Sequence, residues 1–456
     1  MRIAIVGGLA AGPAAAAEAK RRAPDAEVVM FEEGPHVSVG TCEIPYYVAG
    51  RLGGADSLVV HSAEELERSR GFEVRLRHRV TALDARAGRL TVDALDYGST
   101  HHETFDRVIL ATGARARRLD VPGADAAGVF VIRDLEDAEA VKTWLDTEPV
   151  RHVVVAGGGY IGLEMAEAAV DRGLRATILD PSGRVLNNTI ACEASDLMDE
   201  AVRAAGVAVR AEKPAEVLTD GAGRVRAVKT DAGEMIGCQM VVVSIGVEPR
   251  TELAVDAGAE TGGMGGLKVD DRMKTSLPNV WACGDVVEIP RAPDGKRVLW
   301  PLAPTGRRSA RVAARNVAAR GGRADTFQPI AGGVAVKAFG VEAASVGLSM
   351  KQAGEAGLDA VAADVRHRTK TAAYPGACPI DARLVVERGS GRILGGQLVA
   401  SEGAALRADT LVPLVIRGAT ARELAEDLDL VYNPPVAPAV DPLKVAASVA
   451  MDRAAE

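Results

Sequence analysis

The chain has 456 residues, of which 48% are hydrophobic and 25% charged, with a formal net charge of −8; at roughly 100–200 residues per domain, this length predicts two to four domains. No basic block is present, which argues against a nucleic-acid partner, and no apolar run reaches the roughly 20 residues that a membrane helix needs. The five cysteines lie far apart with no CxxC pair, which argues against a zinc ribbon or a secreted disulfide framework and favours the reducing cytoplasm.

The first predicted element is an apolar strand over residues 2–6, and no charged leader with an apolar core precedes it, so we expect no signal peptide. A glycine turn from Gly7 to Gly12 and an alanine-rich helix follow. Gly7 permits a tight turn, Gly12 lets the helix pack close to the strand, and free N–H groups at the helix start face a pyrophosphate. The next strand, over 28–32, ends in Glu32, which can accept hydrogen bonds from a ribose 2′-OH. This pattern predicts a dinucleotide-binding unit.

A cysteine segment over residues 38–48 follows this unit closely. Thr41 can cap a helix whose first turn holds Cys42, and Pro45 is acceptable that early in a helix. The positive end of a helix lowers the pKa of a thiol, so we expect Cys42 to ionise readily. The remaining cysteines are expected to be inert, because a lone cysteine is usually a small buried hydrophobe; they are Cys192, Cys238, Cys283 and Cys378.

A second unit repeats the pattern of the first, since residues 153–162 match residues 3–12. Its glycine fingerprint is complete, with Gly157, Gly159 and Gly162 after a clean apolar strand. The next strand ends in Asp180, which would accept from a 2′-OH and repel a 2′-phosphate, so NADH is favoured over NADPH. Arg184 lies close enough in sequence to soften that preference. Two such units predict two nucleotide sites in one chain.

Further strands end in short glycine motifs. Residues 108–110 lead into Ala111-Thr112-Gly113, residues 241–245 into Gly246, and residues 279–282 into Cys283-Gly284-Asp285. From about residue 326 the sequence pattern changes to short apolar runs typical of β-strands, including 382–387 and 393–399. Helical stretches near 403–418 and 420–427 and a proline-rich segment over 432–442 follow. We interpret this part as a separate C-terminal domain.

The ordered motifs resemble those of the single-cysteine branch of the pyridine nucleotide–disulfide oxidoreductases, which includes coenzyme A-disulfide reductases, NADH oxidases, NADH peroxidases and polysulfide reductases. The resemblance spans essentially the whole chain and includes Cys42-x-x-Pro-Tyr, Pro301-Leu302-Ala303-Pro304-Thr305, Tyr374-Pro375-Gly376 and Tyr432-Asn433-Pro434-Pro435. It implies an α/β fold with two Rossmann-like dinucleotide-binding domains and an α+β C-terminal dimerisation domain. Residues 1–115 and 247–325 would form a discontinuous FAD-binding domain, 116–246 the NAD(P)H-binding domain, and 326–456 the dimerisation domain of a homodimer.

The same resemblance assigns roles to individual residues. Asp285 would bind the ribityl chain of FAD, Glu164 would lie near the nicotinamide, and Cys283 would be a structural neighbour of the flavin. Tyr374 and Tyr432 of the partner subunit would act with Cys42, because a phenol can donate a proton to a departing thiolate. The full set of cofactor-binding residues implied for the two sites is Gly7, Gly12, Glu32, Thr112, Gly113, Gly157, Gly159, Gly162, Glu164, Asp180, Gly246, Gly284, Asp285 and Ala303.

Some residues differ from those that the resembled family carries at the same motif positions, and these differences favour some reactions of Cys42 over others. Tyr47 stands where paired-cysteine relatives carry a second cysteine, so Cys42 must cycle as a sulfenic acid, a mixed disulfide or a persulfide. Ala10 stands where peroxidase and oxidase relatives carry a histidine, which makes peroxide and oxygen chemistry less favoured. Glu43 beside Cys42 would oppose thiolate formation and disfavour an anionic substrate. Residues 20–22, Lys-Arg-Arg, could meet the phosphates of coenzyme A or be an ordinary solvated helix end, so binding of coenzyme A stays open.

The sequence therefore favours an FAD-dependent NADH or NADPH oxidoreductase that reduces a small disulfide, persulfide or polysulfide through Cys42. Two alternatives stay open. One is an NADH oxidase or peroxidase in which Cys42 becomes a sulfenic acid. The other is an electron-transfer reductase that feeds a protein partner, or a nucleotide-sensing flavoprotein with an idle cysteine.

Overall fold

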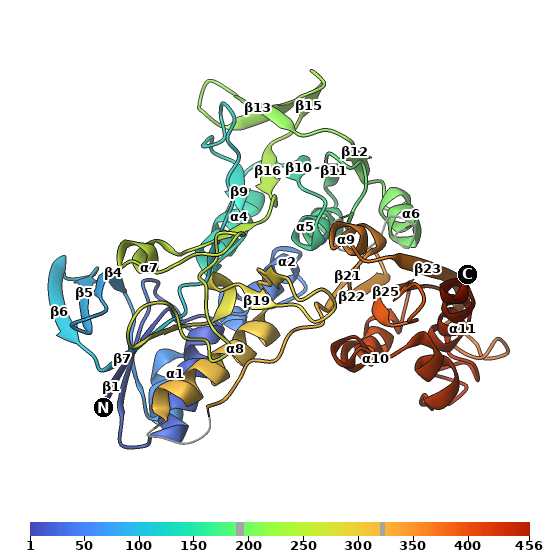
Figure 1. Ribbon diagram of the computed structural model, residues 1–456. Coiled ribbons are helices and arrows are strands. Elements are labelled where there is room, and N and C mark those ends of the chain that lie inside the picture. The colour runs from blue at the N-terminus through green and yellow to red at the C-terminus, as the bar shows by residue number, and fades with distance from the viewer. Residues whose placement is uncertain (188–195, 320–323) are drawn as a thin grey trace.

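Three sheets organise the chain. The computed structural model describes residues 1–187, 196–319 and 324–456. In Figure 1 the first sheet lies with the long helices α1 and α8, the second sheet lies above it, and the third forms the C-terminal body beside them. The predicted combination of two parallel nucleotide-binding sheets and a C-terminal α+β domain is confirmed, while the boundaries at about residues 115, 246 and 325 stay a prediction.

The first sheet is parallel and has the strand order β18-β7-β1-β2-β3. Most of its strands are nearly continuous apolar runs, as expected of a parallel sheet that is covered on both faces. They are β1 (Arg2–Val6), β2 (Glu27–Phe31), β3 (Glu73–Arg75), β7 (Arg107–Leu110) and β18 (Val280–Ala282). The helices of this part are α1 (Ala11–Arg22), α2 (Ile44–Val48), α3 (Ala63–Arg70), α7 (Glu252–Asp256) and α8 (Ala303–Ala318). The same part of the chain contains an antiparallel three-stranded sheet of β4 (His78–Asp84), β5 (Arg89–Ala94) and β6 (Ser99–Thr104). It also contains two short strand pairs. In one, β8 (Ala114–Ala116) pairs with β17 (Val247–Pro249), and in the other, β19 (Ile289–Pro290) pairs with β20 (Arg297–Val298).

The second sheet repeats the arrangement, with the order β12-β11-β10-β16-β9. β10 lies between β11 and β16 just as β1 lies between β2 and β7, so each glycine turn leaves a central strand. The strands are β9 (Val129–Val131), β10 (His152–Ala156), β11 (Arg175–Leu179), β12 (Ala208–Arg210) and β16 (Met240–Val243). Helices α4 (Leu135–Thr147), α5 (Tyr160–Asp171) and α6 (Asp196–Ala204) and the antiparallel strands β13 (Pro214–Thr219), β14 (Val225–Thr230) and β15 (Met235–Gly237) complete it.

The third sheet is antiparallel, with the order β21-β22-β25-β24-β23. Its strands are β21 (Val334–Ala338), β22 (Val341–Gly347), β23 (Ala360–Arg368), β24 (Pro379–Glu387) and β25 (Ile393–Ala400), and its helices are α9 (Met350–Glu355), α10 (Ala404–Arg417) and α11 (Pro442–Ala455). α10 and α11 share one core with this sheet, while Val336, Ala343 and Val399 join a core that also contains Ile44 and Leu163. The segment of α2 therefore packs on α4 and α5 of the second unit and shares a core with strands of the third sheet.

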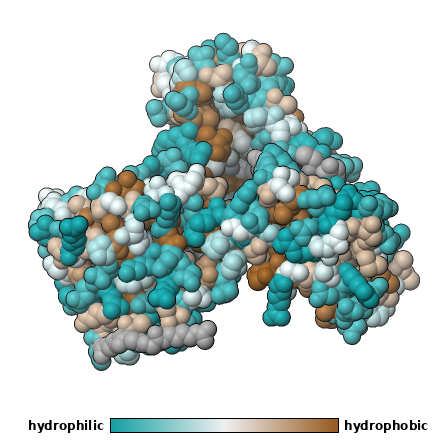
Figure 2. All heavy atoms as spheres, viewed as in Figure 1, coloured by the Kyte–Doolittle hydropathy of each residue, from teal (hydrophilic) through white to brown (hydrophobic). Residues whose placement is uncertain are grey.

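No helix within the described ranges is long and apolar enough to cross a bilayer. The face seen in Figure 2 is mainly hydrophilic, and its hydrophobic residues form separate patches rather than one belt.

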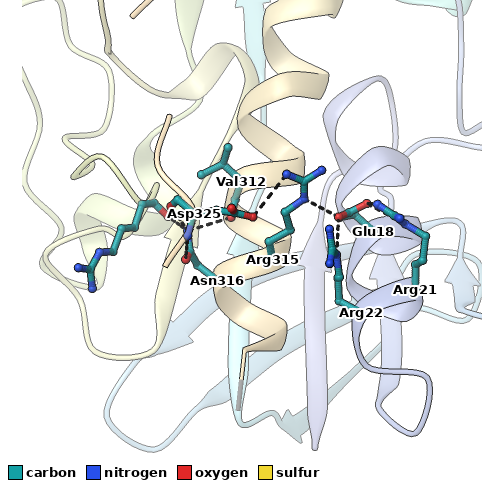
Figure 3. Close-up of polar contacts among 8 residues, drawn as sticks. Glu18, Arg21, Arg22, Val312, Arg315, Asn316 and Asp325 are labelled. Atoms are coloured by element: carbon teal, nitrogen blue, oxygen red, sulfur yellow. Dashed lines mark hydrogen bonds and ion pairs between the residues drawn. The ribbon is translucent and has the colours of Figure 1, made fainter. Parts of the chain in front are cut away.

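A buried carboxylate joins α1 to α8 (Figure 3). The side chain of Glu18 is only 6% exposed and forms ion pairs with Arg21, with Arg22 at 3.1 Å and with Arg315 of α8 at 2.6 Å. Burial alone would raise the pKa of Glu18, but the hydrogen bonds from these arginines outweigh it and lower the pKa to about 2. Lys20 donates to the carbonyl oxygen of Ala26 at 2.9 Å. The side chains of Lys20, Arg21 and Arg22, which could have met coenzyme A phosphates, therefore already have partners within this chain.

Loss of the Glu18 charge is expected to destabilise the fold. The folded-state pKa lies below the ordinary 4.5, so this stabilisation is complete above pH 4.5 and is lost as the pH falls toward 2. Because Arg21 and Arg22 are about half exposed, we expect Glu18→Gln to lower the free energy of unfolding at pH 7 by about 1–2 kcal/mol. Urea denaturation of both proteins at pH 7 and pH 3 measures this. Glu27→Gln, at an exposed pair with Arg2, should cost much less, and equal losses in the two variants would contradict the assignment.

Candidate active site

A cavity of about 880 Å³ lies where the first glycine turn, the cysteine segment and the start of α5 meet. A cavity of this size has room for a large cofactor. It is lined by nine of the predicted site residues, namely Gly7, Glu32, Cys42, Thr112, Gly113, Glu164, Gly284, Asp285 and Ala303. Eight predicted residues do not line it, namely Gly12, Gly157, Gly159, Gly162, Asp180, Gly246, Tyr374 and Tyr432.

The first glycine turn is shaped for close approach. Gly7 has a φ of +109°, and a Cβ added to Gly12 would overlap the carbonyl oxygen of Gly7. No side chain caps the start of α1, so its first N–H groups are free to meet an anion. Glu32 accepts from Gly8 N at 2.6 Å and from Gly34 N at 2.8 Å, and burial raises the pKa of its carboxyl while these bonds oppose the rise. The turn and the acid fit a dinucleotide with its pyrophosphate at α1.

Cys42 lies on a three-residue 3₁₀ turn, Thr41–Glu43, that runs directly into α2. Our prediction that Thr41 caps this helix is wrong, because Gly40 holds the cap position and no side chain caps the turn. The predicted fall in the thiol pKa is also wrong: burial, Glu43 and Glu164 raise the pKa of Cys42, and Arg133 only partly offsets them. So short a turn provides little helix dipole. Glu43 raises the pKa of Cys42, as expected of a carboxylate that opposes formation of the thiolate.

Asp285 forms an ion pair with Arg133, a residue that sequence reasoning missed. Their atoms Oδ2 and Nη2 are 2.8 Å apart, and both residues line the cavity. Arg133 follows β9 and precedes Asp134, whose side chain caps α4. Its Nε is buried and has no hydrogen-bond partner among the described residues. A donor of this kind suits an oxygen or nitrogen acceptor of a bound cofactor.

Glu164 accepts a hydrogen bond from the hydroxyl of Tyr46 at 3.2 Å. Burial raises the pKa of Glu164 to about 7, the Tyr46 bond opposes this rise, and Glu167 adds to it. Burial and Glu164 together raise the pKa of Tyr46 to about 12, so the phenol is the donor at neutral pH. Glu164 thus brings an ionisable carboxyl from the second nucleotide unit into the cavity that holds Cys42.

The second glycine turn repeats the geometry of the first outside the cavity. Gly158 N donates to Asp180 Oδ2 at 2.9 Å, just as Gly8 N donates to Glu32, and Ser182 Oγ donates to Asp180 Oδ1 at 2.6 Å. Arg184, which was expected to soften the preference for NADH, forms ion pairs with Asp196 at 2.6 Å and Asp199 at 2.7 Å on α6. The Arg184 guanidinium therefore already pairs with two carboxylates of the second unit.

The two predicted tyrosines lie in the third domain and do not reach the cavity of their own chain. Tyr374 is 41% exposed and Tyr432 50%. Their loops are joined by a backbone hydrogen bond from Thr371 N to Pro434 O at 3.4 Å. The two loops that carry these exposed tyrosines therefore adjoin in the C-terminal domain.

The other cysteines differ from Cys42 in their surroundings. Cys238 and Cys283 are fully buried, and burial raises the pKa of each to about 12, as expected of inert thiols. Cys378 is partly exposed in the third domain and donates to the carbonyl oxygen of Gly376 at 3.1 Å. Cys192 lies outside the described residues.

Two family profiles match the chain. Residues 1–315 match the profile described as pyridine nucleotide-disulphide oxidoreductase, and residues 334–443 match the dimerisation domain of the same family.

Similar proteins agree with these matches. The NAD(P)H coenzyme A polysulfide/persulfide reductase of Pyrococcus horikoshii is 34% identical over 98% of both chains. The NADH oxidase of Methanocaldococcus jannaschii is 29% identical over 99% of both chains. The solved structure of an NAD-dependent persulfide reductase from A. fulgidus has a TM-score of 0.95 at 31% identity, covering 99% of this chain and 83% of that one. The chain belongs to the FAD-dependent pyridine nucleotide–disulphide oxidoreductase family.

Proposed function

We propose that this protein is an FAD-dependent NAD(P)H oxidoreductase that reduces a small disulfide, persulfide or polysulfide through Cys42. The observation that carries the proposal is the shared cavity, which joins Cys42 and the first glycine turn to Glu164 of the second unit. A route for electrons from a nicotinamide coenzyme to a sulfur atom needs this juxtaposition. Relatives named as polysulfide/persulfide reductase and coenzyme A disulfide reductase support the substrate class.

FAD would be held by the first unit. The turn after Gly7 and the N-terminus of α1 would meet the pyrophosphate, Glu32 the ribose, and Asp285 with Arg133 the part of the cofactor nearer the flavin ring. Thr112 and Ala303 would line the same path, and Thr112 Oγ1 is fixed by donating to Arg250 O at 2.7 Å. FAD, when bound, would take two electrons from the nicotinamide coenzyme and pass them to a mixed disulfide or persulfide on Cys42, with release of a thiol or sulfide.

The nicotinamide coenzyme would lie at the second turn, with Gly157, Gly159 and Gly162 at its pyrophosphate and Asp180 at its ribose. Asp180 already accepts three hydrogen bonds and offers negative charge, which supports NADH over NADPH. The ion pairs of Arg184 with α6 support the same preference.

Cys42 would act as the nucleophile. Its thiolate attacks one sulfur of an R–S–S–R′ substrate, the new bond joins Cys42 to R–S, and R′–S⁻ leaves and takes up a proton. We assign that proton to Tyr374 and Tyr432 of the partner subunit, because both are exposed and lie outside the cavity of their own chain. The match to the dimerisation domain supports the homodimer that this requires. Tyr47 is buried and offers no second thiol, so the adduct on Cys42 cannot be resolved by an internal disulfide.

The alternative of an NADH oxidase is favoured by one observation, the likeness to relatives of that name. Ala10 opposes it, because this residue lines the cavity without a group that can move a proton.

A comparison of electron acceptors tests the proposal. With NADH as donor, we expect turnover with polysulfide, coenzyme A persulfide or a small disulfide to exceed turnover with oxygen or hydrogen peroxide by about a hundredfold. NADH loss measured anaerobically with each acceptor, and with an oxygen electrode in air, decides the question. Oxygen consumption that matches NADH loss would instead support the oxidase. Slow turnover with every small acceptor, but rapid turnover with a purified protein partner, would support the electron-transfer alternative.

A further inference from the structure

Polar contacts tie the cysteine segment, and Arg51 just after it, to α5 at successive helical turns. Tyr46 bonds Glu164 at 3.2 Å, and Arg51 bonds Glu167 at 3.2 Å and Asp171 at 2.6 Å. The Arg51 guanidinium also lies 5.9 Å from the centre of the Tyr46 ring. The segment that carries Cys42 is thereby held against the helix that starts at the second glycine turn.

Only the innermost of these contacts faces the cavity. Tyr46 and Glu164 line it, whereas Arg51, Glu167 and Asp171 do not. The groups that act on the Glu164 carboxyl are Tyr46 and Glu167, and Cys42 and Tyr160 face it from the same cavity. No lysine or arginine of the described chain forms an ion pair with Glu164. The Glu164 carboxyl in the cavity is thus stabilised by a hydrogen bond from a neutral hydroxyl and has no ion pair within the described residues.

The position of Glu164 on α5 would place it near the nicotinamide end of a coenzyme bound at the second glycine turn. A dinucleotide at the second glycine turn places its pyrophosphate at the N-terminus of α5. The α5 residues that line the cavity, Tyr160, Ile161 and Glu164, then lie where the nicotinamide end enters. The nicotinamide ring carries a positive charge in NAD⁺ and none in NADH, so a nearby carboxylate distinguishes the two forms.

We propose that Tyr46 is a positioning residue whose hydrogen bond to Glu164 sets how strongly the second nucleotide site prefers oxidised over reduced coenzyme. This inference rests on the proposed function, because it needs a nicotinamide coenzyme at the second glycine turn. Tyr46, a residue of the cysteine segment, would then control how the second site discriminates oxidised from reduced coenzyme.

The pH dependence follows from the pKa of Glu164, which burial raises to about 7. Above that pH the carboxylate is ionised and favours NAD⁺, and below it the neutral carboxyl does not. The ratio of affinities for the oxidised and reduced forms should therefore rise as the pH passes through about 7. The Tyr46 hydroxyl stabilises the ionised form, so its removal should move this transition to higher pH.

The experiment uses the FAD-loaded oxidised enzyme and two ligands that do not react with it, NAD⁺ and 1,4,5,6-tetrahydro-NAD, a neutral analogue of NADH. Their dissociation constants are measured by calorimetry between about pH 5.5 and 8.5, which brackets the Glu164 transition. We expect the affinity ratio to change up to about tenfold in the wild type, and the midpoint to rise by about half to one pH unit in Tyr46→Phe. Glu164→Gln should make the ratio independent of pH.

Arg172→Gln is the matched control, because it breaks the contact of Arg172 with Val48 O in the cysteine segment and its ion pair with Asp146, without touching the cavity or the groups that act on Glu164. It should lower the melting temperature and leave the midpoint where it is in the wild type. A flat ratio in the wild type, or an unchanged midpoint in a folded, FAD-loaded Tyr46→Phe protein, would overturn the inference. If Tyr46→Phe does not fold, Glu164→Gln still tests the inference. An affinity ratio that changes with pH in Glu164→Gln would overturn the inference as well. Failure of NADH to reduce the bound FAD in the wild type would refute the proposed function instead.

Discussion

Replacement of Cys42 by serine is expected to abolish the reduction of polysulfide, persulfide and disulfide acceptors. A serine hydroxyl cannot form or resolve a bond to sulfur, and Cys42 is the one cysteine of the described chain that lines the cavity. We expect the turnover number to fall about a thousandfold or more, as when other enzymes lose their nucleophile. Reduction of bound FAD by NADH does not need the thiol and should stay close to its wild-type rate. Stopped-flow absorbance of the flavin and steady-state NADH loss separate the two half-reactions.

Cys238→Ala provides the control for this prediction. Cys238 is buried in the core of the second unit and does not line the cavity, so its loss should leave both half-reactions intact. Persistence of acceptor turnover in Cys42→Ser would refute the proposed role of the thiol. A slow reduction of FAD in that variant would place Cys42 in coenzyme binding instead.

Replacement of Gly12 by alanine is expected to abolish the binding of FAD. The added Cβ would overlap the carbonyl oxygen of Gly7, and that oxygen belongs to the backbone, which cannot move aside without separating α1 from β1. The turn that would cradle the pyrophosphate is then lost. We expect protein purified without flavin and a much lower melting temperature, measured by absorbance and by thermal denaturation.

Gly162→Ala makes the same change in the second unit, where the new Cβ would overlap the carbonyl oxygen of Gly157. This variant should keep its FAD but no longer be reduced by NADH. Gly237→Ala is the control, since Gly237 lies in β15 of the same unit, away from both turns, and nothing lies within 4 Å of the new Cβ; it should be tolerated. Loss of FAD from Gly162→Ala would contradict the assignment of the two turns to different nucleotides.

The parts of the structure that could be predicted from sequence are those determined by local spacing. Each glycine turn, its strands and its terminal acid lie within about 30 residues, and a dinucleotide unit has a period of that length. Gly8 and Gly158 consequently donate to Glu32 and Asp180 in the same way. The strands of the C-terminal domain and the helix near 403–418 followed from their apolar patterns and agree with β24, β25 and α10.

What could not be predicted depends on partners distant in sequence. Tyr46 and Glu164 are 118 residues apart, so neither the hydrogen bond nor the raised pKa of Glu164 had a local signal. The pKa of Cys42 was predicted in the wrong direction partly for the same reason, because burial and the distant Glu164 raise it in addition to its neighbour Glu43. Arg133 has no motif of its own and lies 152 residues from Asp285.

The helix end at residues 20–22 is an intermediate case. The spacing of Glu18 to Arg21 and Arg22 is the i,i+3 and i,i+4 spacing of helical ion pairs and could have been recognised. The third partner, Arg315, lies 297 residues away on α8, and only the fold reveals that it completes the cluster.

Electrons reach a substrate sulfur through Cys42 in the proposed reaction, and mass spectrometry of the FAD-loaded protein tests this most directly. After brief exposure to polysulfide without oxygen, we predict added sulfur on the peptide that contains Cys42, and its disappearance when NADH is supplied. An unmodified Cys42 peptide during turnover, or an adduct that NADH does not remove, would contradict the account.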